Sequence, residues 1–252
     1  MHLYEFFQAH PCSAVAFSGG ADSAFLLWAA KRYGCQVGAY YAKTPFQPAF
    51  ELDDARRLAA DLAVPLTVVE LDTLSLPQAA ANGPERCYFC KRALMGALLE
   101  AARRDGYPLL LDGTNASDDG GDRPGMRAGA ELGVCSPLRL CGLTKGEIRR
   151  QSQQAGLFTW DKPAYACLAT RVPTGTPITP DALERVEQGE RALAGLGFSD
   201  LRVRLTAEGY ARLQLPANQL DRALALREAL LAALDPVFPG VFLDLHPRPD
   251  GD

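Results

Sequence analysis

The sequence has no long apolar run, and its first residues carry no basic segment followed by an apolar stretch. A membrane helix needs about 18 or more consecutive apolar residues, and a secretory signal needs that basic start. We therefore expect no membrane partner and a cytoplasmic protein. An excess of positive charge is also lacking, since the formal net charge is -4. This balance argues against a partner such as long nucleic acid and favours small-molecule chemistry.

Histidine is scarce, with three residues, and the seven cysteines are an odd number. In a reducing compartment such cysteines are thiols or metal ligands, so we expect no disulfide framework. Cys12 and Cys35 lie in or beside apolar runs, where a cysteine is typically a small buried hydrophobe. We interpret Cys135 and Cys141 as structural too.

What the sequence does contain is an alternation of strand-like and helix-like runs. With 252 residues, 48% of them hydrophobic, the chain can bury a substantial core. Strands are predicted at residues 13–17, 36–41, 66–71 and 109–112, and helices at residues 24–33, 49–62 and 91–104. This pattern predicts an α/β fold with a parallel sheet, whose ligands bind at the carboxyl ends of the strands. The polar loop at residues 112–129 should lie at that edge.

The second part of the chain has a different pattern. A Pro, Gly and Thr cluster at residues 171–180 is typical of a linker, so we expect a first domain at residues 1–174 and a second at residues 175–252. The elements predicted there are helices at residues 181–196 and 219–234 and strands at residues 201–206, 210–215 and 241–245. They indicate a small C-terminal α+β domain.

The segment SGGADS, residues 18–23, stands between a strand-like and a helix-like run. Its glycines let the backbone approach a ligand, and the N–H groups of the helix start with two serine hydroxyls make an anion cradle. The spacing matches neither GxxxxGK[ST] nor GxGxxG. It resembles the PP-loop of ATP pyrophosphatases, which split ATP into AMP and pyrophosphate while adenylating a substrate.

This resemblance implies that the protein binds ATP together with Mg²⁺. Mg²⁺ is typically held by one or two carboxylates together with phosphate oxygens. A carboxylate beside a pyrophosphate site is therefore expected to be a ligand of this cation. Asp22 is the carboxylate that we expect to serve both the metal and catalysis. The expected ATP-binding residues are Ser18, Gly19, Gly20, Ala21, Asp22, Ser23 and Thr114.

Three further cysteines stand in the motifs RCYFCK and ACLATR. Cys87 and Cys90 are three residues apart at an expected helix start, so both thiols can face one side, and Cys167 follows much later. Together with SGGADS, and in the same order, these motifs resemble the LarE family of ATP-dependent sulfur transferases. Members adenylate a carboxylate of pyridinium-3,5-biscarboxylic acid mononucleotide and convert it into a thiocarboxylate for the nickel-pincer nucleotide cofactor.

The resemblance implies one of two sulfur sources. In one, Cys167 attacks the acyl-adenylate and gives up its sulfur, leaving dehydroalanine. In the other, Cys87, Cys90 and Cys167 are the metal ligands of a [4Fe-4S] cluster whose fourth iron delivers hydrosulfide. Three thiolates suit a cubane with an open iron better than structural zinc, which normally takes four protein ligands. We therefore expect the cluster and keep the sacrificial cysteine as the alternative.

Basic residues complete the expected site. Lys91 and Arg171 are the last residues of the two cysteine motifs. They could offset charge during attack on the adenylate, or be ordinary exposed bases. Arg202 and Arg204 alternate on a predicted strand and so share one face. The resemblance implies that they bind the phosphate of the mononucleotide substrate, joined by Arg212 on the next strand.

Some expectations stay open. The family commonly has an acidic residue where Gln214 stands, so no role is assigned to it. A tRNA thiolase of the PP-loop class and a non-catalytic nucleotide-binding iron-sulfur carrier are alternative functions. The resemblance also implies a homohexamer and partner proteins of the cofactor pathway, with a sulfide source that the sequence does not identify. A capping box is expected at Thr144 and Glu147.

Overall fold

A computed structural model describes residues 1–118 and 124–248 of the chain. The chain divides into two compact units. Unit 1 comprises Met1–Thr44, Ala49–Asp72 and Cys87–Lys162, and unit 2 comprises Pro45–Pro48, Thr73–Arg86 and Pro163–Asp252. The domain boundary expected between residues 174 and 175 stays a prediction.

Unit 1 is built on a parallel sheet. Its strands are β1 (Cys12–Ala16), β2 (Gln36–Lys43), β3 (Leu66–Glu70) and β4 (Leu110–Leu111). They lie in the order β3-β2-β1-β4, and every neighbouring pair is parallel. The predicted α/β fold is therefore confirmed, with each strand ending within two residues of the expected position.

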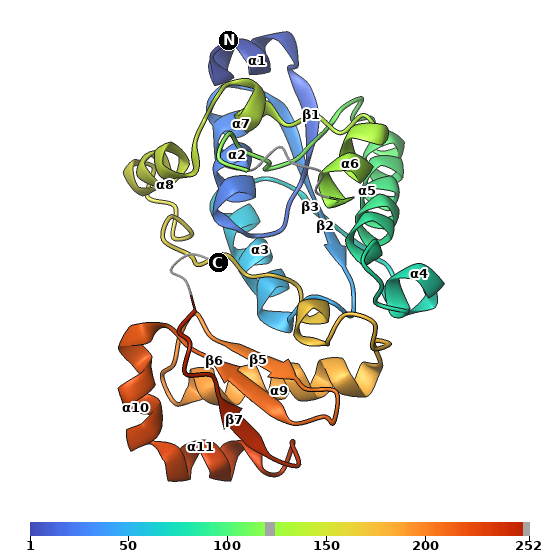
Figure 1. The fold of residues 1–252 in the computed structure, drawn as a ribbon. Helices are drawn as coiled ribbons and strands as arrows, with labels where there is room; N and C mark the ends of the chain where they lie inside the picture. Colours follow the sequence, from blue (N-terminus) through green and yellow to red (C-terminus); the bar gives the residue numbers. More distant parts are fainter. Residues whose placement is uncertain (119–123, 249–252) are drawn as a thin grey trace. The chain divides into compact units, whose positions relative to one another are not determined.

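Helices cover both faces of this sheet (Figure 1). They are α1 (Leu3–Ala9), α2 (Ala21–Arg32), α3 (Ala49–Asp61), α5 (Arg86–Arg104), α6 (Pro124–Glu131), α7 (Pro137–Leu140) and α8 (Lys145–Gln154). Val15 and Phe17 belong to a core shared with α2 and α3, whereas Ala14 and Ala16 belong to a core shared with α5. This alternation follows from the two-residue period of a strand.

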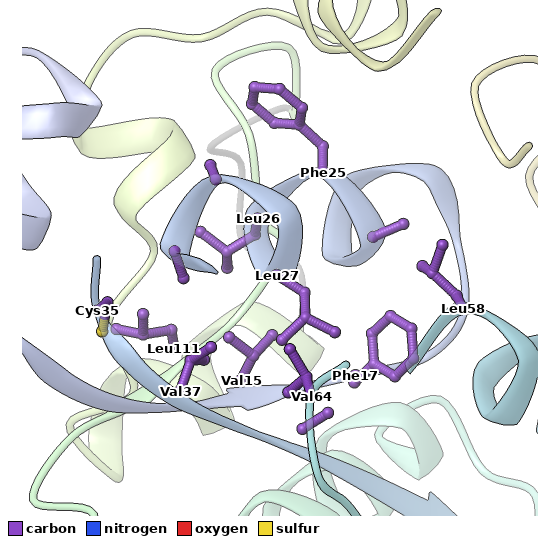
Figure 2. Close-up of a cluster of buried hydrophobic side chains, with 14 of the residues drawn as sticks. Val15, Phe17, Phe25, Leu26, Leu27, Cys35, Val37, Leu58, Val64 and Leu111 are labelled. Carbon is purple, nitrogen blue, oxygen red and sulfur yellow. The ribbon is translucent and has the colours of Figure 1, made fainter. Parts of the chain in front are cut away.

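Figure 2 shows the first of these cores, in which Leu26 and Leu27 of α2 lie over Val15. Cys35 is 5% exposed in this cluster, and burial raises the pKa of its thiol. Its predicted role as a buried hydrophobe is confirmed. Cys135 and Cys141 are half-buried and pack against the same core, where burial also raises the pKa of both thiols.

One expectation for unit 1 is wrong in part. Residues 124–129 were expected to be loop, but Pro124–Glu131 forms helix α6. Residues 119–123 of that expected loop lie outside the described residues. The capping box is confirmed, because the Thr144 side chain accepts a hydrogen bond from the Glu147 backbone N–H at the start of α8.

Unit 2 contains a three-stranded sheet and the helix α9 (Pro180–Gly195). Its strands are β5 (Arg202–Leu205), β6 (Ala211–Gln214) and β7 (Val241–Leu243), and β5 pairs antiparallel and β7 parallel with β6. The unit also holds η1 (Thr73–Ser75), α4 (Pro77–Ala80), η2 (Leu168–Arg171), η3 (Ala217–Gln219), α10 (Leu220–Ala225) and α11 (Arg227–Leu234).

The single helix predicted at residues 219–234 is wrong, because the chain forms two helices there. Leu226 ends α10 and precedes α11 with φ -95° and ψ 18°, outside the helical region. Across residues 1–118 and 124–248, no helix combines the length and the apolar character needed to cross a membrane.

Candidate functional site

The SGGADS segment forms a tight loop between β1 and α2, as its glycines predicted. Gly20 is the N-cap of α2, and the helix begins at Ala21. The hydroxyls of Ser18 and Ser23 lie 3.1 Å apart, and the Ser18 backbone N–H donates to Ser23 Oγ. The loop thus presents the N-terminus of a twelve-residue helix, which favours an anionic ligand.

Gly19 is required by both conformation and space. Its φ of +72° lies in the left-handed region, where residues with a Cβ are strained. A Cβ at this position would also lie 3.2 Å from the Glu51 carbonyl oxygen and 3.4 Å from the Ala55 nitrogen. Helix α3 therefore packs directly against the loop, and only glycine fits between them.

Asp22, in the first turn of α2, pairs with a lysine that the sequence analysis did not assign. Lys145 Nζ lies 2.6 Å from Asp22 Oδ2, and the two side chains are 33% and 25% exposed. Asp22 Oδ1 is buried and has no hydrogen-bond partner among the described residues. A buried carboxylate oxygen without a partner suits a cation ligand, since its desolvation is otherwise uncompensated.

A second lysine that the sequence analysis missed also contacts the loop. Lys162 Nζ donates to the Gly19 carbonyl at 3.2 Å and to Asp54 Oδ2 at 2.6 Å. Its side chain is 17% exposed. The ammonium group therefore ties the loop to α3, which carries Asp54.

The segment after β4 also contacts the end of the SGGADS loop. A Cβ on Gly113 would lie 2.9 Å from the Ser23 nitrogen, so this segment touches the start of α2. The next residue, Thr114, donates from its hydroxyl to Asp112 Oδ2 at 3.0 Å. The structure thus brings the neighbour of Thr114 against the SGGADS loop, while an ATP contact of Thr114 itself stays a prediction.

Cys87 and Cys90 lie on the first turns of α5, with Cys87 exposed and Cys90 half-buried. Lys91 follows them and is partly exposed. Arg86, directly before Cys87, donates to the Asn82 side chain at 2.6 Å and to the Ala169 carbonyl at 2.9 Å. This second bond joins the residue before Cys87 to the short helix η2, which begins one residue after Cys167.

Cys167 is half-buried and is the N-cap residue of η2. Arg171, at the end of η2, holds the turn around this cysteine. Its Nη1 donates to the carbonyl of Ala166 at 2.9 Å and to the hydroxyl of Thr170 at 2.7 Å, and that hydroxyl donates to the Cys167 carbonyl. The Cys167 backbone is therefore fixed by contacts on both sides.

The Arg171 guanidinium is also buried against an acidic residue. Its Nε donates to Glu190 Oε1 at 2.7 Å, and Arg171 is 1% exposed. The other oxygen, Glu190 Oε2, accepts a hydrogen bond from the hydroxyl of Tyr165. The alternative reading of Arg171 as an ordinary exposed base is therefore wrong.

The three predicted phosphate-binding arginines come together at one pocket of unit 2. This pocket has a volume of about 500 Å³. Its lining residues are Ala166, Thr170, Arg202, Arg204, Arg212, Gln214, Asp244, His246, Pro247 and Arg248. Arg248, Asp244 and His246 are lining residues that the sequence analysis did not find. Ala166 and Thr170 belong to the turn that carries Cys167, so the arginines and this turn share the pocket wall.

Positive charge is concentrated and partly desolvated around this pocket. Burial, then the nearby Arg171 and Arg248, lowers the pKa of the Arg202 guanidinium to about 10. The same causes lower the pKa of Arg204. Because each positive charge raises the cost of the others, a bound anion would relieve the repulsion.

Gln214 and Asp244 organise the outer side of the pocket. Gln214 accepts a hydrogen bond from Arg204 Nε at 2.6 Å and donates to Asp244 Oδ2 at 3.0 Å. Asp244 also accepts from Arg212 Nε at 3.0 Å, and the Gln214 and Arg212 contacts lower the pKa of its carboxyl. The side-chain amide of Gln214 therefore connects Arg204 to Asp244, which in turn contacts Arg212.

The predicted metal ligands come from both units of the chain. Among residues 1–118 and 124–248, no three histidine, cysteine, aspartate or glutamate side chains are arranged so that they could hold a metal ion. Cys87 and Cys90 belong to unit 1 and Cys167 to unit 2. The thiols have the right chemistry for a cluster, which stays a prediction.

Comparison with known proteins identifies relatives across most of the chain, although no family model matches it. An uncharacterised protein of Synechocystis is 36% identical over 222 residues, which are 88% of this chain and 82% of the relative. Pyridinium-3,5-bisthiocarboxylic acid mononucleotide synthase of Lactiplantibacillus plantarum is 32% identical over 234 residues, which are 92% of this chain and 84% of the synthase. The chain belongs to the LarE family.

Membership of the LarE family makes this chain an enzyme of the synthase class. A shorter match relates it to a wider group. The tRNA(Ile)-lysidine synthase of Polaromonas naphthalenivorans is 37% identical over 122 residues, 44% of this chain and 35% of that synthase. This match and the parallel sheet agree with the PP-loop fold that the LarE resemblance implied.

Proposed function

We propose that this enzyme uses ATP to convert a carboxylate of pyridinium-3,5-biscarboxylic acid mononucleotide into a thiocarboxylate. The name of the Lactiplantibacillus relative, a bisthiocarboxylic acid mononucleotide synthase, supports this substrate class. In the first step a substrate carboxylate oxygen attacks the α-phosphorus of ATP, and pyrophosphate leaves. In the second step a sulfur nucleophile attacks the acyl carbon, and AMP leaves with the carboxylate oxygen.

The SGGADS loop is the proposed ATP site. Backbone N–H groups at the start of α2 and the hydroxyls of Ser18 and Ser23 would bind phosphate oxygens. Asp22 would hold Mg²⁺, and its buried, unpartnered Oδ1 supports a cation at that position. The metal would neutralise charge on the phosphates, so that the carboxylate can approach the α-phosphorus.

One observation carries the assignment of the second substrate. The arginine pocket is lined by Ala166 and Thr170, which belong to the turn that carries Cys167. A phosphate bound by Arg202 and Arg204 would therefore anchor a mononucleotide next to the residue proposed to deliver sulfur. Arg212, which is exposed, would join them at the rim of the pocket.

Two further basic residues receive proposed roles. Lys91 would offset the charge of the acyl-adenylate during attack. Arg171 was expected to do the same, but its guanidinium contacts Glu190 and the Cys167 turn. We therefore propose that Arg171 acts as a positioning residue for Cys167.

The proposed sulfur source depends on three cysteine thiols. Cys87, Cys90 and Cys167 would be the three ligands of a [4Fe-4S] cluster, which when bound supplies a replaceable hydrosulfide. The hydrogen bond from Arg86 to the Ala169 carbonyl supports this choice, because it ties the residue before Cys87 to the segment after Cys167. In the sacrificial alternative Cys167 Sγ attacks the acyl carbon, and elimination from the resulting thioester leaves dehydroalanine. A homohexamer, pathway partners and a cytoplasmic location stay predictions.

Pyrophosphate release tests the proposal. The purified enzyme with ATP and Mg²⁺ should release pyrophosphate only when the biscarboxylate mononucleotide is added. Asp22→Asn should reduce the rate by about 10²-fold or more, the loss typical for removing a group that stabilises transition-state charge. Asp53→Asn is the matched control, because Asp53 has a 76% exposed side chain on α3.

Two results would contradict the proposal. Full activity in the Asp22→Asn variant would show that Asp22 is not the metal ligand. Release stimulated by bulk tRNA, and not by the mononucleotide, would favour the tRNA thiolase alternative.

A further inference from the structure

The arginine pocket is bordered by a bulge in the segment after β7, the strand that lies beside β6 (Figure 1). The Asp244 backbone N–H donates to the Leu213 carbonyl at 2.9 Å. The Arg248 backbone N–H donates to the Leu215 carbonyl, also at 2.9 Å. The segment takes four residue steps between these bonds where β6 and its end take two, so its middle residues bulge away from the sheet. His246 is the central residue of this bulge, and it is exposed and lines the pocket.

The backbone of His246 is fixed, whereas its ring is not. Its backbone N–H donates to Asp244 Oδ1 at 3.2 Å, and the other oxygen of Asp244 accepts hydrogen bonds from Arg212 and Gln214. Pro247 follows and restricts the backbone further. Within residues 1–118 and 124–248, the imidazole of His246 makes no hydrogen bond. The ring is therefore held at the pocket and available to a bound molecule.

The arginines of this pocket give part of their hydrogen bonds to the protein itself. Arg202 donates to the carbonyls of Leu201 and Ala164, each at 2.7 Å. Arg204 donates from Nη1 to the Thr170 carbonyl at 2.5 Å. A phosphate monoester offers three strong acceptor oxygens. These arginines supply positive charge, but a phosphate in the pocket still has acceptor capacity for a further donor.

An imidazole differs from the other charged side chains of this pocket. Those side chains are Asp244, Arg202, Arg204, Arg212 and Arg248. The pKa of the Arg202 guanidinium is about 10, and the Gln214 and Arg212 contacts lower the pKa of the Asp244 carboxyl. Both groups therefore keep their charge near neutral pH. Histidine is the side chain that ordinarily changes charge between about pH 5 and 8.

We infer that His246 is a further ligand of the mononucleotide's phosphate and donates a hydrogen bond from its protonated imidazole to a phosphate oxygen. This inference rests on the proposed function, which makes the arginine pocket the phosphate site. Imidazolium and phosphate dianion favour each other's charged form, because opposite charges in contact do so. A phosphate monoester is dianionic above about pH 6. Binding is therefore tightest just above that pH and weakens as the imidazole loses its proton.

Nuclear magnetic resonance of the histidine rings tests this on the full chain, which has three histidines. His2→Gln and His10→Gln variants assign the other two signals, since both residues flank α1 in unit 1. A pH titration gives the pKa of each ring alone, with the biscarboxylate mononucleotide, and with inorganic phosphate. We expect both ligands to raise the pKa of His246 by about one pH unit or more, a differential interaction typical of an opposite charge in contact. His2 and His10 should not respond.

Calorimetry of mononucleotide binding gives a second, independent measurement. The affinity of the wild type should fall several-fold between about pH 6.5 and about pH 8. His246→Gln keeps a hydrogen-bond donor but does not titrate. This variant should bind equally at both pH values, with an affinity close to that of the wild type at the higher pH. His10→Gln is the matched control and should follow the wild type.

The outcomes separate this inference from the proposed function. If the mononucleotide binds but the pKa of His246 stays unchanged, the inference is wrong and the arginine pocket remains the proposed phosphate site. A response to the mononucleotide and not to inorganic phosphate would also overturn it, because the ring would then contact another part of the ligand. If the mononucleotide does not bind to the folded wild type, the inference and the proposed substrate both fall.

Discussion

Arg171 and Glu190 form a buried ion pair, with Arg171 Nε 2.7 Å from Glu190 Oε1 and side chains 0% and 7% exposed. The pair joins helix α9 to the turn that carries Cys167, because the same guanidinium donates to the Ala166 carbonyl. Glu190 also accepts from the backbone N–H of Val203 on β5. One carboxylate therefore connects α9, β5 and the Cys167 turn.

We predict that Glu190→Gln destabilises unit 2 strongly. Removing one partner of a buried ion pair typically costs about 3–5 kcal/mol in free energy of unfolding, because the other charge is left buried. Urea unfolding of the variant and the wild type measures the loss. Glu184→Gln, at an exposed position of the same helix, is the control and should change little. Equal midpoints for Glu190→Gln and the wild type would refute a structural role of the pair.

Gly19→Ala should impair both folding and ATP binding. Gly34→Ala is a matched control in the same unit, since its φ is +80° and a Cβ there meets nothing within 4 Å. Gly34→Ala should cost about 1–2 kcal/mol, the usual cost of the left-handed region for residues with a Cβ. Gly19→Ala should cost more, because its Cβ also approaches Glu51. Thermal unfolding and ATP titration of both variants check this, and equal losses would show that the close approach of α3 is unimportant.

Substitutions in the arginine pocket should weaken mononucleotide binding more than ATP binding. Arg204→Ala should raise the apparent binding constant of the mononucleotide by about tenfold or more, because a charged hydrogen bond to phosphate is lost. Arg212→Ala, at an exposed position, should have a smaller effect. Arg191→Ala is the control, since its side chain is 69% exposed on α9. Parallel losses for both ligands would indicate a folding defect and not a phosphate site.

The parallel sheet could be predicted from the sequence, because strands buried on both faces are apolar throughout. Helix α6 was missed because its sequence PGMRAGAE resembles a loop, although proline is well suited to the first position of a helix. The break at Leu226 could not be predicted, since no glycine or proline marks it in residues 219–234. Local propensity there favours one continuous helix.

The SGGADS loop could also be predicted, because its glycines and serines are adjacent in sequence. The contacts of Lys145 and Lys162 could not, since they join residues 123 and 143 positions apart. The burial of Glu190 could have been predicted from the sequence, because this residue lies on the same helical face as Val186 and Leu193. A carboxylate on an apolar face indicates a buried partner, which the structure identifies as Arg171.

Substitution of the cysteines distinguishes the two sulfur sources. If Cys87, Cys90 and Cys167 hold a cluster, anaerobic reconstitution with iron and sulfide should give bound iron, and each Cys→Ala variant should lose most of it. Mass spectrometry after turnover should then find the intact chain. A chain lighter by the mass of H₂S, without bound iron, would contradict the cluster and identify Cys167 as the consumed sulfur donor.

The central claim is that this enzyme places sulfur on a carboxylate at the expense of ATP. Its most direct test is mass spectrometry of the nucleotide after incubating the purified enzyme with pyridinium-3,5-biscarboxylic acid mononucleotide, ATP and Mg²⁺. The reaction is run once with reconstituted protein and sulfide and once with untreated protein. We predict AMP, pyrophosphate and a mononucleotide in which one carboxylate oxygen is replaced by sulfur. An unchanged mononucleotide in both reactions, with the protein folded and ATP bound, would contradict the account.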